Sequence, residues 1–444
     1  MFWYVGLTTG DPRNFQRYKW NAITSSQVAP CSADAQGVAS RDLLVPGRAD
    51  LGPDYPSVPV RLYAPADVGV APLHAAAGST SQQRPLPVLL FLHGGGMCIN
   101  HASSKVHHDL VCALVRRLRC WAISVDYRLA PEDPFPAALR DAYTVLSWLH
   151  LSRIEEQAGT QAGTSSQAQG QSEALPPVGL AQVILAGDSA GGNLALVLSL
   201  LAAKGVDADG RADPAVAEAG TESGGDTGAE LCGVGSANRA DLASERRRDI
   251  RKERFAPLRR LLMHSALIYP SLYERDTASA RRKGLRYFLP APMRTFYVNS
   301  YLSGYDPPCA ARRTRQRELL GDWRVAPLRA SSALSLLPDT SIISCELDPL
   351  RDEDLLLAQA LRDAGVTVTH LHADAAPHGY LSFPSWAADA KKVEEGIAFL
   401  VASIQGSCNA AAAATDTPVG TPSLSQYHVA TESSIITSAP NSSH

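Results

Sequence analysis

Short apolar runs recur along the chain, and most of them stop at glycine, proline or aspartate. They occupy residues 86–92, 120–126, 181–186, 264–270, 340–347 and 366–372. Runs of this length, rich in branched residues and bounded by helix breakers, predict strands that are buried on both faces, as in a parallel sheet. Residues 40–64, which include Val-Pro-Val-Arg-Leu-Tyr, predict an antiparallel hairpin that precedes them.

Segments with helical spacing separate these runs. Apolar positions three or four residues apart occur in residues 104–118, 136–150, 351–364 and 388–404. Regular alternation of strand and helix implies a doubly wound sheet, because each crossover helix must return over one face of the sheet. We therefore predict an α/β fold with a mostly parallel, twisted sheet and helices on both faces.

Three segments fall outside this alternation. Residues 155–178 are rich in Gln, Ala, Gly and Ser, residues 205–250 in Ala, Gly and acidic groups, and residues 406–444 in Ala, Ser, Thr and Asn. Few apolar side chains are present there to offset the entropy of ordering, so we expect loops or disorder. This predicts a poorly defined segment 1–39, one domain 40–405 with two insertions, and a disordered tail.

Composition and charge narrow the classes of protein. Apolar residues make up 45% and charged residues 19% of the chain, as in an ordinary globular protein, and the net charge of −3 gives no attraction to nucleic acid. No apolar run reaches the ~18 residues that a membrane span requires. The N-terminus lacks the basic region of a secretory signal. The eight cysteines form no C-x-x-C pair. We expect a reduced, intracellular, cytoplasmic protein.

A basic cluster lies at residues 246–254, within the second insertion. It contains Arg246-Arg247-Arg248 and, shortly after, Arg251-Lys252 and Arg254. Such runs are usually solvated, and we expect that here. Peripheral contact with anionic lipid headgroups and a nuclear signal are the alternatives.

The strongest chemical signal is Gly187-Asp188-Ser189-Ala190-Gly191, which joins an apolar run to an apolar helix. This is the G-x-S-x-G nucleophile elbow in its expected context. Side chains in place of Gly187 and Gly191 would collide with the neighbouring strand or helix. The motif predicts that Ser189 is a nucleophile beside a helix N-terminus, whose dipole favours negative charge. An ordinary strand-to-helix turn is the alternative.

A second glycine-rich motif, His93-Gly94-Gly95-Gly96, closes the first of the apolar runs. Acyl transfer requires N–H donors where the carbonyl oxygen becomes an oxyanion, and glycines free the backbone to supply them. We predict an oxyanion hole made by the N–H groups of Gly95, Gly96 and Ala190. His93 is expected to be structural, hydrogen-bonded within its loop. For the glycines alone, a flexible loop is the alternative.

The predicted acid is Asp348, at the end of the run 340–347. A carboxylate at the carboxyl end of a parallel strand points into the crevice where such sheets bind ligands. Asp352 and Glu353 suit the first turn of the following helix, where acids meet the dipole. Glu346 lies inside the strand and is a weaker candidate.

The predicted base is His378, in the loop that follows the last apolar run. His370 and His372 lie within that run and are expected to be structural. The chain order of Ser189, Asp348 and His378 is the order in which this kind of sheet delivers its triad. No histidine or cysteine pattern shows zinc-ligand spacing, so we expect no metal and no cofactor.

Five motifs in this order resemble the hormone-sensitive-lipase group of α/β-hydrolases. They are residues 93–96, 127–132 (Tyr-Arg-Leu-Ala-Pro-Glu), 187–192, 348–353 and 378–379. That group includes microbial esterases, arylacetamide-deacetylase-like enzymes and plant carboxylesterases. The resemblance implies an α/β-hydrolase fold with a small helical cap, carboxylic-ester hydrolysis, and the triad named above. In the family, the run 127–132 is a structural turn.

Residues 287–302 predict a helix that begins near Pro292. Met293, Phe296 and Tyr297 fall on one face of it. The resemblance implies that this helix belongs to the cap, so that these three side chains line an acyl pocket. Ordinary packing against the core is an equally good interpretation.

Together these patterns predict a serine hydrolase that cleaves small-molecule carboxylic esters, with short to medium acyl chains, through an acyl-enzyme. Amide hydrolysis of the deacetylase type needs the same residues and stays open. A non-catalytic receptor, similar to the plant gibberellin receptors that resemble this family but lack the histidine, is disfavoured by His378.

Overall fold

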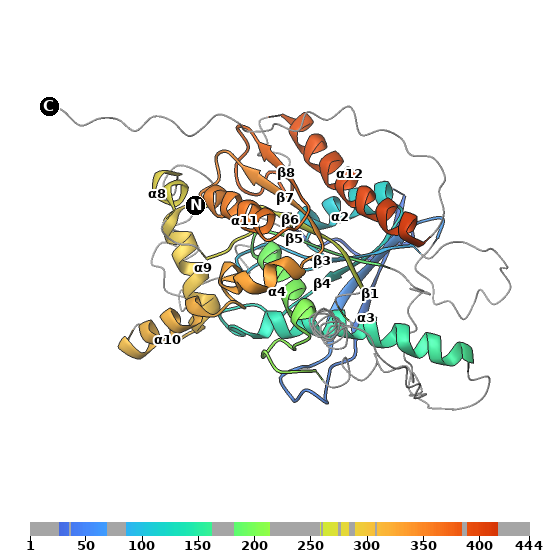
Figure 1. The fold of residues 1–444 in the computed structure, drawn as a ribbon, viewed down its shortest axis with the longest axis horizontal. Coiled ribbons are helices and arrows are strands. Elements are labelled where there is room, and N and C mark those ends of the chain that lie inside the picture. Colours follow the sequence, from blue (N-terminus) through green and yellow to red (C-terminus); the bar gives the residue numbers. More distant parts are fainter. Residues whose placement is uncertain are drawn as a thin grey trace, which may run out of the picture.

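A computed structural model describes residues 26–34, 37–68, 86–161, 182–213, 258, 261–273, 277–283, 289–306, 309–383 and 389–415. An eight-stranded sheet lies at its centre (Figure 1). In spatial order the strands are β1 (Val38–Val45), β2 (Val58–Pro65), β4 (Trp121–Val125), β3 (Val88–Leu92), β5 (Val183–Asp188), β6 (Leu262–Ile268), β7 (Asp339–Cys345) and β8 (Val368–Ala373). Strands β1, β2 and β4 pair antiparallel, and all other pairs are parallel. The predicted fold class is confirmed.

Strand β3 shows why these sequences are continuously apolar. Leu90 and Leu92 belong to the hydrophobic core on one face of the sheet, and Leu89 and Phe91 to the core on the other. Successive side chains of a strand point to opposite faces. All four side chains are buried, so neither face of β3 tolerates a polar residue.

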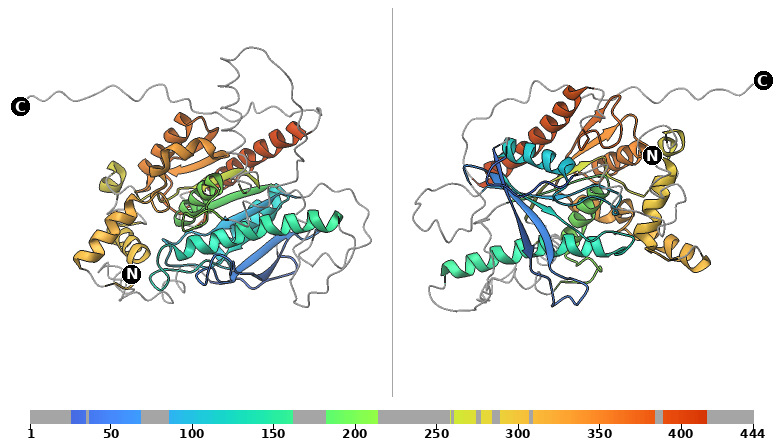
Figure 2. Two further views of the ribbon diagram at one scale, coloured as in Figure 1. Left: turned by 60° about the horizontal axis from the view of Figure 1, so that its bottom comes forward. Right: turned by 180° about the vertical axis from the view of Figure 1, so that it is seen from behind.

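Helices cover both faces of the sheet (Figures 1 and 2). One face carries α3 (Ala137–Gln161), α4 (Ala190–Lys204), α11 (Arg351–Asp363) and the 3₁₀ segment η4 (Pro327–Leu336). The other carries α2 (Lys105–Leu118) and α12 (Ala390–Thr415). A third group lies together to one side, made of α8 (Ala278–Lys283), α9 (Ala291–Ser303) and α10 (Ala310–Gly321). In the described part of the chain, no helix combines the length and the apolar character needed to cross a membrane.

Helix α12 continues past residue 405, where the sequence analysis placed the start of the tail, to Thr415. Ser407 and Cys408 still contact the core, and the hydroxyl of Ser407 lies 2.9 Å from Nδ1 of His264. The alanine run 410–414 then extends the helix, because alanine has the highest helix propensity. The predicted tail therefore starts too early, and residues 416–444 lie outside the described residues.

The second insertion also starts later than predicted, because residues 205–213 pack against the core. Asp213 is 1% exposed and accepts hydrogen bonds from the guanidinium of Arg48 at 2.8 and 3.0 Å. The hydroxyl of Tyr143 donates to the same carboxylate at 2.8 Å. Removal of one partner would leave a buried charge uncompensated. These residues are part of the domain.

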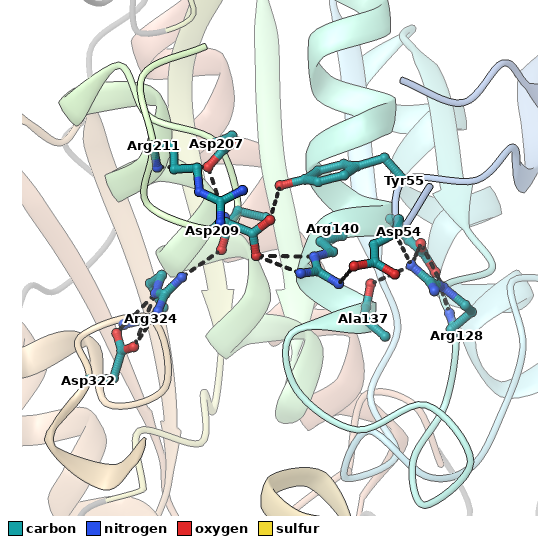
Figure 3. Close-up of polar contacts among 12 residues, drawn as sticks. Asp54, Tyr55, Arg128, Ala137, Arg140, Asp207, Asp209, Arg211, Asp322 and Arg324 are labelled. Carbon is teal, nitrogen blue, oxygen red and sulfur yellow. Dashed lines mark hydrogen bonds and ion pairs between the residues drawn. The ribbon is translucent and has the colours of Figure 1, made fainter. Parts of the chain in front are cut away.

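Asp209 makes a second anchor for the same segment (Figure 3). Its carboxylate accepts from Arg140 at 2.8 Å and from the hydroxyl of Tyr55 at 3.2 Å. Arg324 adds a third contact, to the carbonyl of Ala208 at 3.1 Å. Polar residues of low sequence complexity are thus ordered here by ion pairs that join distant parts of the chain.

Most of the two insertions, at 162–181 and 214–257, lies outside the described residues, and so does the basic cluster 246–254. Both insertions connect a helix to the next parallel strand. In this architecture such connections lie at the amino ends of the strands, opposite the crevice.

We expect deletion of residues 164–178 and 215–245, each bridged by Gly-Ser, to change kcat/KM on a short ester by less than about tenfold, since loop-closure entropy varies slowly with length. Extending the second deletion back through residues 208–213 should lower the melting temperature, because it removes the Arg48–Asp213 pair. Both variants are measured by ester hydrolysis and thermal unfolding. A folded first variant without activity would show that the insertions help to build the site.

Candidate active site

Ser189 lies at the tip of the turn between β5 and α4. Its backbone has φ 54° and ψ −117°, a conformation that non-glycine residues adopt only when the surroundings enforce it. A Cβ on Gly191 would lie 1.9 Å from the carbonyl oxygen of Leu92, and one on Gly187 would lie 2.3 Å from the carbonyl oxygen of Gly191. Glycine at both positions therefore lets the backbones pack closely enough to hold the serine in this turn.

His378 lies between Ser189 and Asp348. Its Nε2 is 2.9 Å from Oγ of Ser189, and its Nδ1 is 2.6 Å from Oδ2 of Asp348. The other carboxylate oxygen of Asp348 accepts the N–H of Leu350 at 2.8 Å. Since the carboxylate only accepts, Nδ1 carries the hydrogen, and Nε2 is left with the lone pair that can take the serine proton. The structure thus brings together the three predicted side chains, and Asp348 is 0% exposed.

The other acidic candidates have different contacts. Asp352 and Glu353 lie in the first turn of α11, as expected. Asp352 accepts from the N–H of Ser279 and Glu353 from the N–H of Leu272, both at 2.7 Å. Glu346 accepts a backbone N–H of the loop after β8 at 2.6 Å. Each of these three carboxylates therefore accepts a hydrogen bond from a backbone N–H group, whereas Asp348, which follows β7, contacts His378.

The predicted oxyanion loop packs against α9, one of the three helices (α8, α9 and α10) that correspond to the predicted cap. Gly95 and Gly96 have φ of 129° and 62°, a region that glycine adopts at little cost. A Cβ on Gly96 would lie 2.2 Å from the ring of Tyr297 on α9. Gly96 and Ala190 line the same cavity as the serine, and Gly95 lines an adjoining hollow. Their backbones therefore border the space that a substrate carbonyl would occupy.

Asp188 joins three loops of the site. Its Oδ1 accepts the N–H of Gly94 at 2.7 Å, and its Oδ2 accepts the hydroxyl of Ser382 at 3.1 Å. Nε2 of His107 on α2 lies 3.3 Å away. Burial acts to raise the pKa of Asp188, but His107 and the N–H of Gly94 outweigh burial and hold the pKa below its usual range. Sequence reasoning gave Asp188 only a supporting place in the motif and missed His107, because only folding brings α2 to the elbow.

His93 has contacts of a structural kind. Its ring stacks on Tyr127 with centroids 4.2 Å apart, and its Nδ1 lies 2.9 Å from the carbonyl oxygen of Gly94. The hydroxyl of Tyr127 donates to the carbonyl of His93 at 2.5 Å. Burial lowers the pKa of His93 to about 4, so the ring is neutral near pH 7. The turn that begins at Tyr127 therefore packs against the loop 93–96, which is predicted to form the oxyanion hole.

A cavity of about 170 Å³ opens beside Ser189. Its walls are largely apolar, with Leu289 and Tyr297 on the cap side and the charged Arg294 and Glu353 as polar groups. Neither Arg294 nor Glu353 could be predicted from the sequence to line a pocket, because arginine and glutamate on helices usually face solvent.

Of the three residues predicted to line an acyl pocket, two border the space beside Ser189 and one does not. Tyr297 lines the cavity and the adjoining hollow, and Met293 lines the hollow. Phe296 lines neither. It is 0% exposed and packs edge-on against Tyr297, with ring centroids 5.6 Å apart. Ordinary packing is therefore the role of Phe296.

Asp354 is buried close to the triad, and neither carboxylate oxygen has a hydrogen-bond partner among the described residues. Burial, and then the charge of Asp348, raise its pKa well above the usual range. Such a group takes up a proton on folding, so wild-type stability falls as pH rises above the unfolded pKa of about 3.9. We expect Asp354→Asn to stabilise the protein, by an amount that grows between pH 5 and pH 8 by up to about 1.4 kcal/mol per pH unit.

Asp352→Asn is the matched control for this prediction. Hydrogen bonds and Arg351 lower the pKa of Asp352 against the opposing effect of burial, so that residue contributes stability above its unfolded pKa. This variant should be destabilised over the same range. Thermal unfolding of the variants at the two pH values measures both effects, and an Asp354→Asn gain that does not vary with pH would contradict the explanation.

The chain belongs to a known family. Residues 89–382 match the family described as "alpha/beta hydrolase fold". The resemblance to the hormone-sensitive-lipase group is confirmed by this match and by the relatives that follow.

Probable carboxylesterase 6 of Arabidopsis thaliana is 31% identical over 182 residues, which are 40% of this chain and 44% of that protein. The chain thus spans about half the length of the plant carboxylesterases it matches. Arylacetamide deacetylase of Oryctolagus cuniculus is 28% identical over 343 residues, 74% of each chain. The crystal structure of a hyperthermophilic esterase from the archaeon Pyrobaculum calidifontis has the same fold, with a TM-score of 0.52 and 23% identity over 83% of each chain.

Proposed function

We propose that this protein hydrolyses carboxylic esters of small molecules, with Ser189 as nucleophile, His378 as general base and Asp348 as the acid that orients the base. The observation that carries the proposal is the unbroken chain of contacts from Oγ of Ser189 to Nε2, and from Nδ1 to Asp348, at 2.9 and 2.6 Å. Because this chain ends beside a cavity, a substrate carbonyl can reach the serine.

The first step is attack by Oγ of Ser189 on the ester carbonyl carbon while Nε2 of His378 takes the hydroxyl proton. The imidazolium that forms is stabilised by the buried carboxylate of Asp348. His378 then returns the proton to the leaving alkoxide, and the alcohol departs. Water attacks the acyl-enzyme by the same route, which releases the carboxylic acid and restores the serine.

Negative charge on the carbonyl oxygen is stabilised by the N–H groups of Gly95, Gly96 and Ala190. Fixed donors are effective in such a place because they need no reorganisation when the charge appears. Ala190 begins α4, so the positive end of the helix dipole adds to the effect. Removal of one such donor typically costs about 10²–10³ in kcat.

The modest cavity favours esters with short to medium acyl chains. Its walls are mostly apolar, so an acyl chain gains from burial, while Tyr297 and Leu289 restrict its length.

We infer a reduced, intracellular setting, and support for it comes from the seven described cysteines, none of which forms a disulfide with another described residue.

Hydrolysis of p-nitrophenyl acetate, butyrate, octanoate and palmitate by the purified protein tests the proposal. We expect kcat/KM to be highest for the first three and to fall for palmitate, with no hydrolysis by Ser189→Ala above background. Tight binding of esters without turnover would instead support a receptor.

Amide hydrolysis is the second candidate, favoured by the likeness to arylacetamide deacetylase. A matched pair, p-nitrophenyl acetate and p-nitroacetanilide, separates the two activities because the acyl groups are identical. A ratio of kcat/KM that favours the anilide would assign the protein to amide cleavage.

A further inference from the structure

Three side chains of metal-ligand type converge at α2, where His108 contacts Tyr63 of β2 while the neighbouring His107 contacts the active-site elbow. Cys112 and His108 are one helical turn apart, and Asp34 comes from the segment that precedes β1. Their ligand atoms all lie within 4.8 Å of one another. Sγ of Cys112 is 3.5 Å from Nε2 of His108, which is 3.7 Å from Oδ2 of Asp34. Cys112 is 0% exposed, and His108 4%.

A hydrogen bond on the far side of the ring fixes how His108 presents Nε2. The hydroxyl of Tyr63 donates its single hydrogen to the carbonyl of Ala102 at 3.3 Å. It therefore accepts from Nδ1 of His108, which is also 3.3 Å away. With the hydrogen on Nδ1, the lone pair of Nε2 points toward Cys112 and Asp34. An outer hydrogen bond of this kind is typical of histidines that bind metal ions.

Three atoms with lone pairs thus face one another, and a hydrogen bond joins the thiol of Cys112 to the carboxylate of Asp34. Oδ1 of Asp34 accepts the N–H of Val38 at 3.0 Å, which directs Oδ2 to the cluster. A Cys–His–Asp hydrolytic triad is excluded, because the carboxylate and the sulfur lie at the same nitrogen of His108 rather than at opposite ones.

The spacing fits a tetrahedral metal ion. With metal–sulfur bonds of about 2.3 Å and metal–nitrogen or metal–oxygen bonds of about 2.0–2.2 Å, the sulfur and nitrogen atoms lie about 3.5 Å apart, and the nitrogen and oxygen about 3.4 Å. These two separations are 3.5 and 3.7 Å, and the sulfur of Cys112 lies within 4.8 Å of the carboxylate oxygen of Asp34. Thiolate and imidazole together favour Zn²⁺ over Mg²⁺ or Ca²⁺, which prefer oxygen ligands.

We infer that Asp34, His108 and Cys112 form a structural Zn²⁺ site, with water as the fourth ligand. Binding replaces the thiol hydrogen of Cys112 with a sulfur–zinc bond and releases the proton to solvent. The site joins the segment before β1 to α2, the helix whose His107 contacts the elbow. This departs from the sequence expectation of no metal, because a His-x-x-x-Cys pair on a helix gains its third ligand only through folding.

The test is zinc titration of the full-length, chelator-treated protein, followed by metal analysis and thermal unfolding. We expect one zinc ion per chain and a melting temperature about 5 °C higher at a hundredfold excess over Kd. Co²⁺ in place of Zn²⁺ should give a thiolate charge-transfer absorption that reports directly on Cys112. Ester hydrolysis by the chelated protein, measured well below its melting temperature, should stay within about twofold, because no ligand belongs to the triad.

Cys112→Ser should weaken zinc binding by at least about 100-fold and abolish the Co²⁺ charge-transfer band. Cys120→Ser is the matched control, because Cys120 is also 0% exposed in the same core and lies outside the cluster. If Cys112→Ser does not fold, zinc binding by Asp34→Asn is the deciding measurement, since Asp34 is partly exposed and its substitution should be tolerated. Absence of zinc binding by the wild type, or equal binding by Asp34→Asn and the wild type, would overturn the inference.

Discussion

Ser189→Ala should lower kcat on p-nitrophenyl butyrate by about 10⁶, the size of loss seen when a nucleophile is removed from a comparable triad. The variant loses the acyl-enzyme route altogether, so only the oxyanion donors and the binding pocket remain to accelerate attack by water. Little structural change is expected, because the turn depends on its glycines and the serine hydroxyl contacts only His378 among the hydrogen bonds described for the site.

Ser271→Ala is the matched control, because Ser271 lines the same cavity as Ser189. Its N–H donates to the carbonyl of Ser189 at 3.1 Å, a bond that survives substitution by alanine. This variant should retain activity within about tenfold. A fluorophosphonate probe should label the wild type and Ser271→Ala once and leave Ser189→Ala unlabelled. Full labelling of Ser189→Ala would show that another residue is the nucleophile.

Asp348→Asn should lower kcat by about 10⁴, with a melting temperature close to that of the wild type. An asparagine amide can donate a hydrogen to Nδ1 of His378, which favours the tautomer with the hydrogen on Nε2. That tautomer cannot accept the proton of Ser189. The side chains therefore keep their positions, but His378 no longer acts as a general base. Measurement of kcat by ester hydrolysis over a range of pH checks the prediction.

Asp352→Asn should act in the opposite way. Asp352 accepts the N–H of Ser279 at the start of α8, a contact that supports the cap. Asparagine has one acceptor oxygen instead of two, so the variant cannot keep both this bond and the ion pair with Arg351. The loss should lower the melting temperature and change kcat by less than about tenfold. If Asp352→Asn lowered kcat and Asp348→Asn lowered only the melting temperature, the assignment of the acid would be wrong.

The sequence alone predicted the elements that local pattern controls. Strands β3 and β5 were evident because burial on both faces requires continuous apolar sequence. Ser189 and Asp348 were evident because they follow the buried strands β5 and β7. His378 follows β8, which was predicted to be buried on both faces but is a partly exposed strand at the edge of the sheet, because no further strand pairs with it among the described residues. The carboxyl ends of parallel strands lie at one edge of the sheet. Ser189, Asp348 and His378 therefore had to lie near one another once their strands were identified.

Contacts made only by folding could not be predicted in this way. The anchoring of residues 205–213 depends on Arg48 and Arg140, far away along the chain, so their polar sequence resembled that of a flexible insertion. The convergence of Asp34 on α2 is of the same kind. Phe296 had the spacing of a pocket residue, but helical periodicity does not distinguish a face that borders a cavity from one that packs against protein.

We expect the contact between Gly96 and Tyr297 to couple the fit of the substrate to the reaction rate. At Gly96 the predicted oxyanion loop touches helix α9, since even a methyl group on Gly96 would overlap the ring of Tyr297. An acyl group that displaces Tyr297 should therefore also disturb the backbone of Gly96, which we propose to face the carbonyl oxygen. Substrates with a poorly fitting acyl group should then have an ordinary KM and a reduced kcat, because the poor fit weakens stabilisation of the transition state more than binding of the ester.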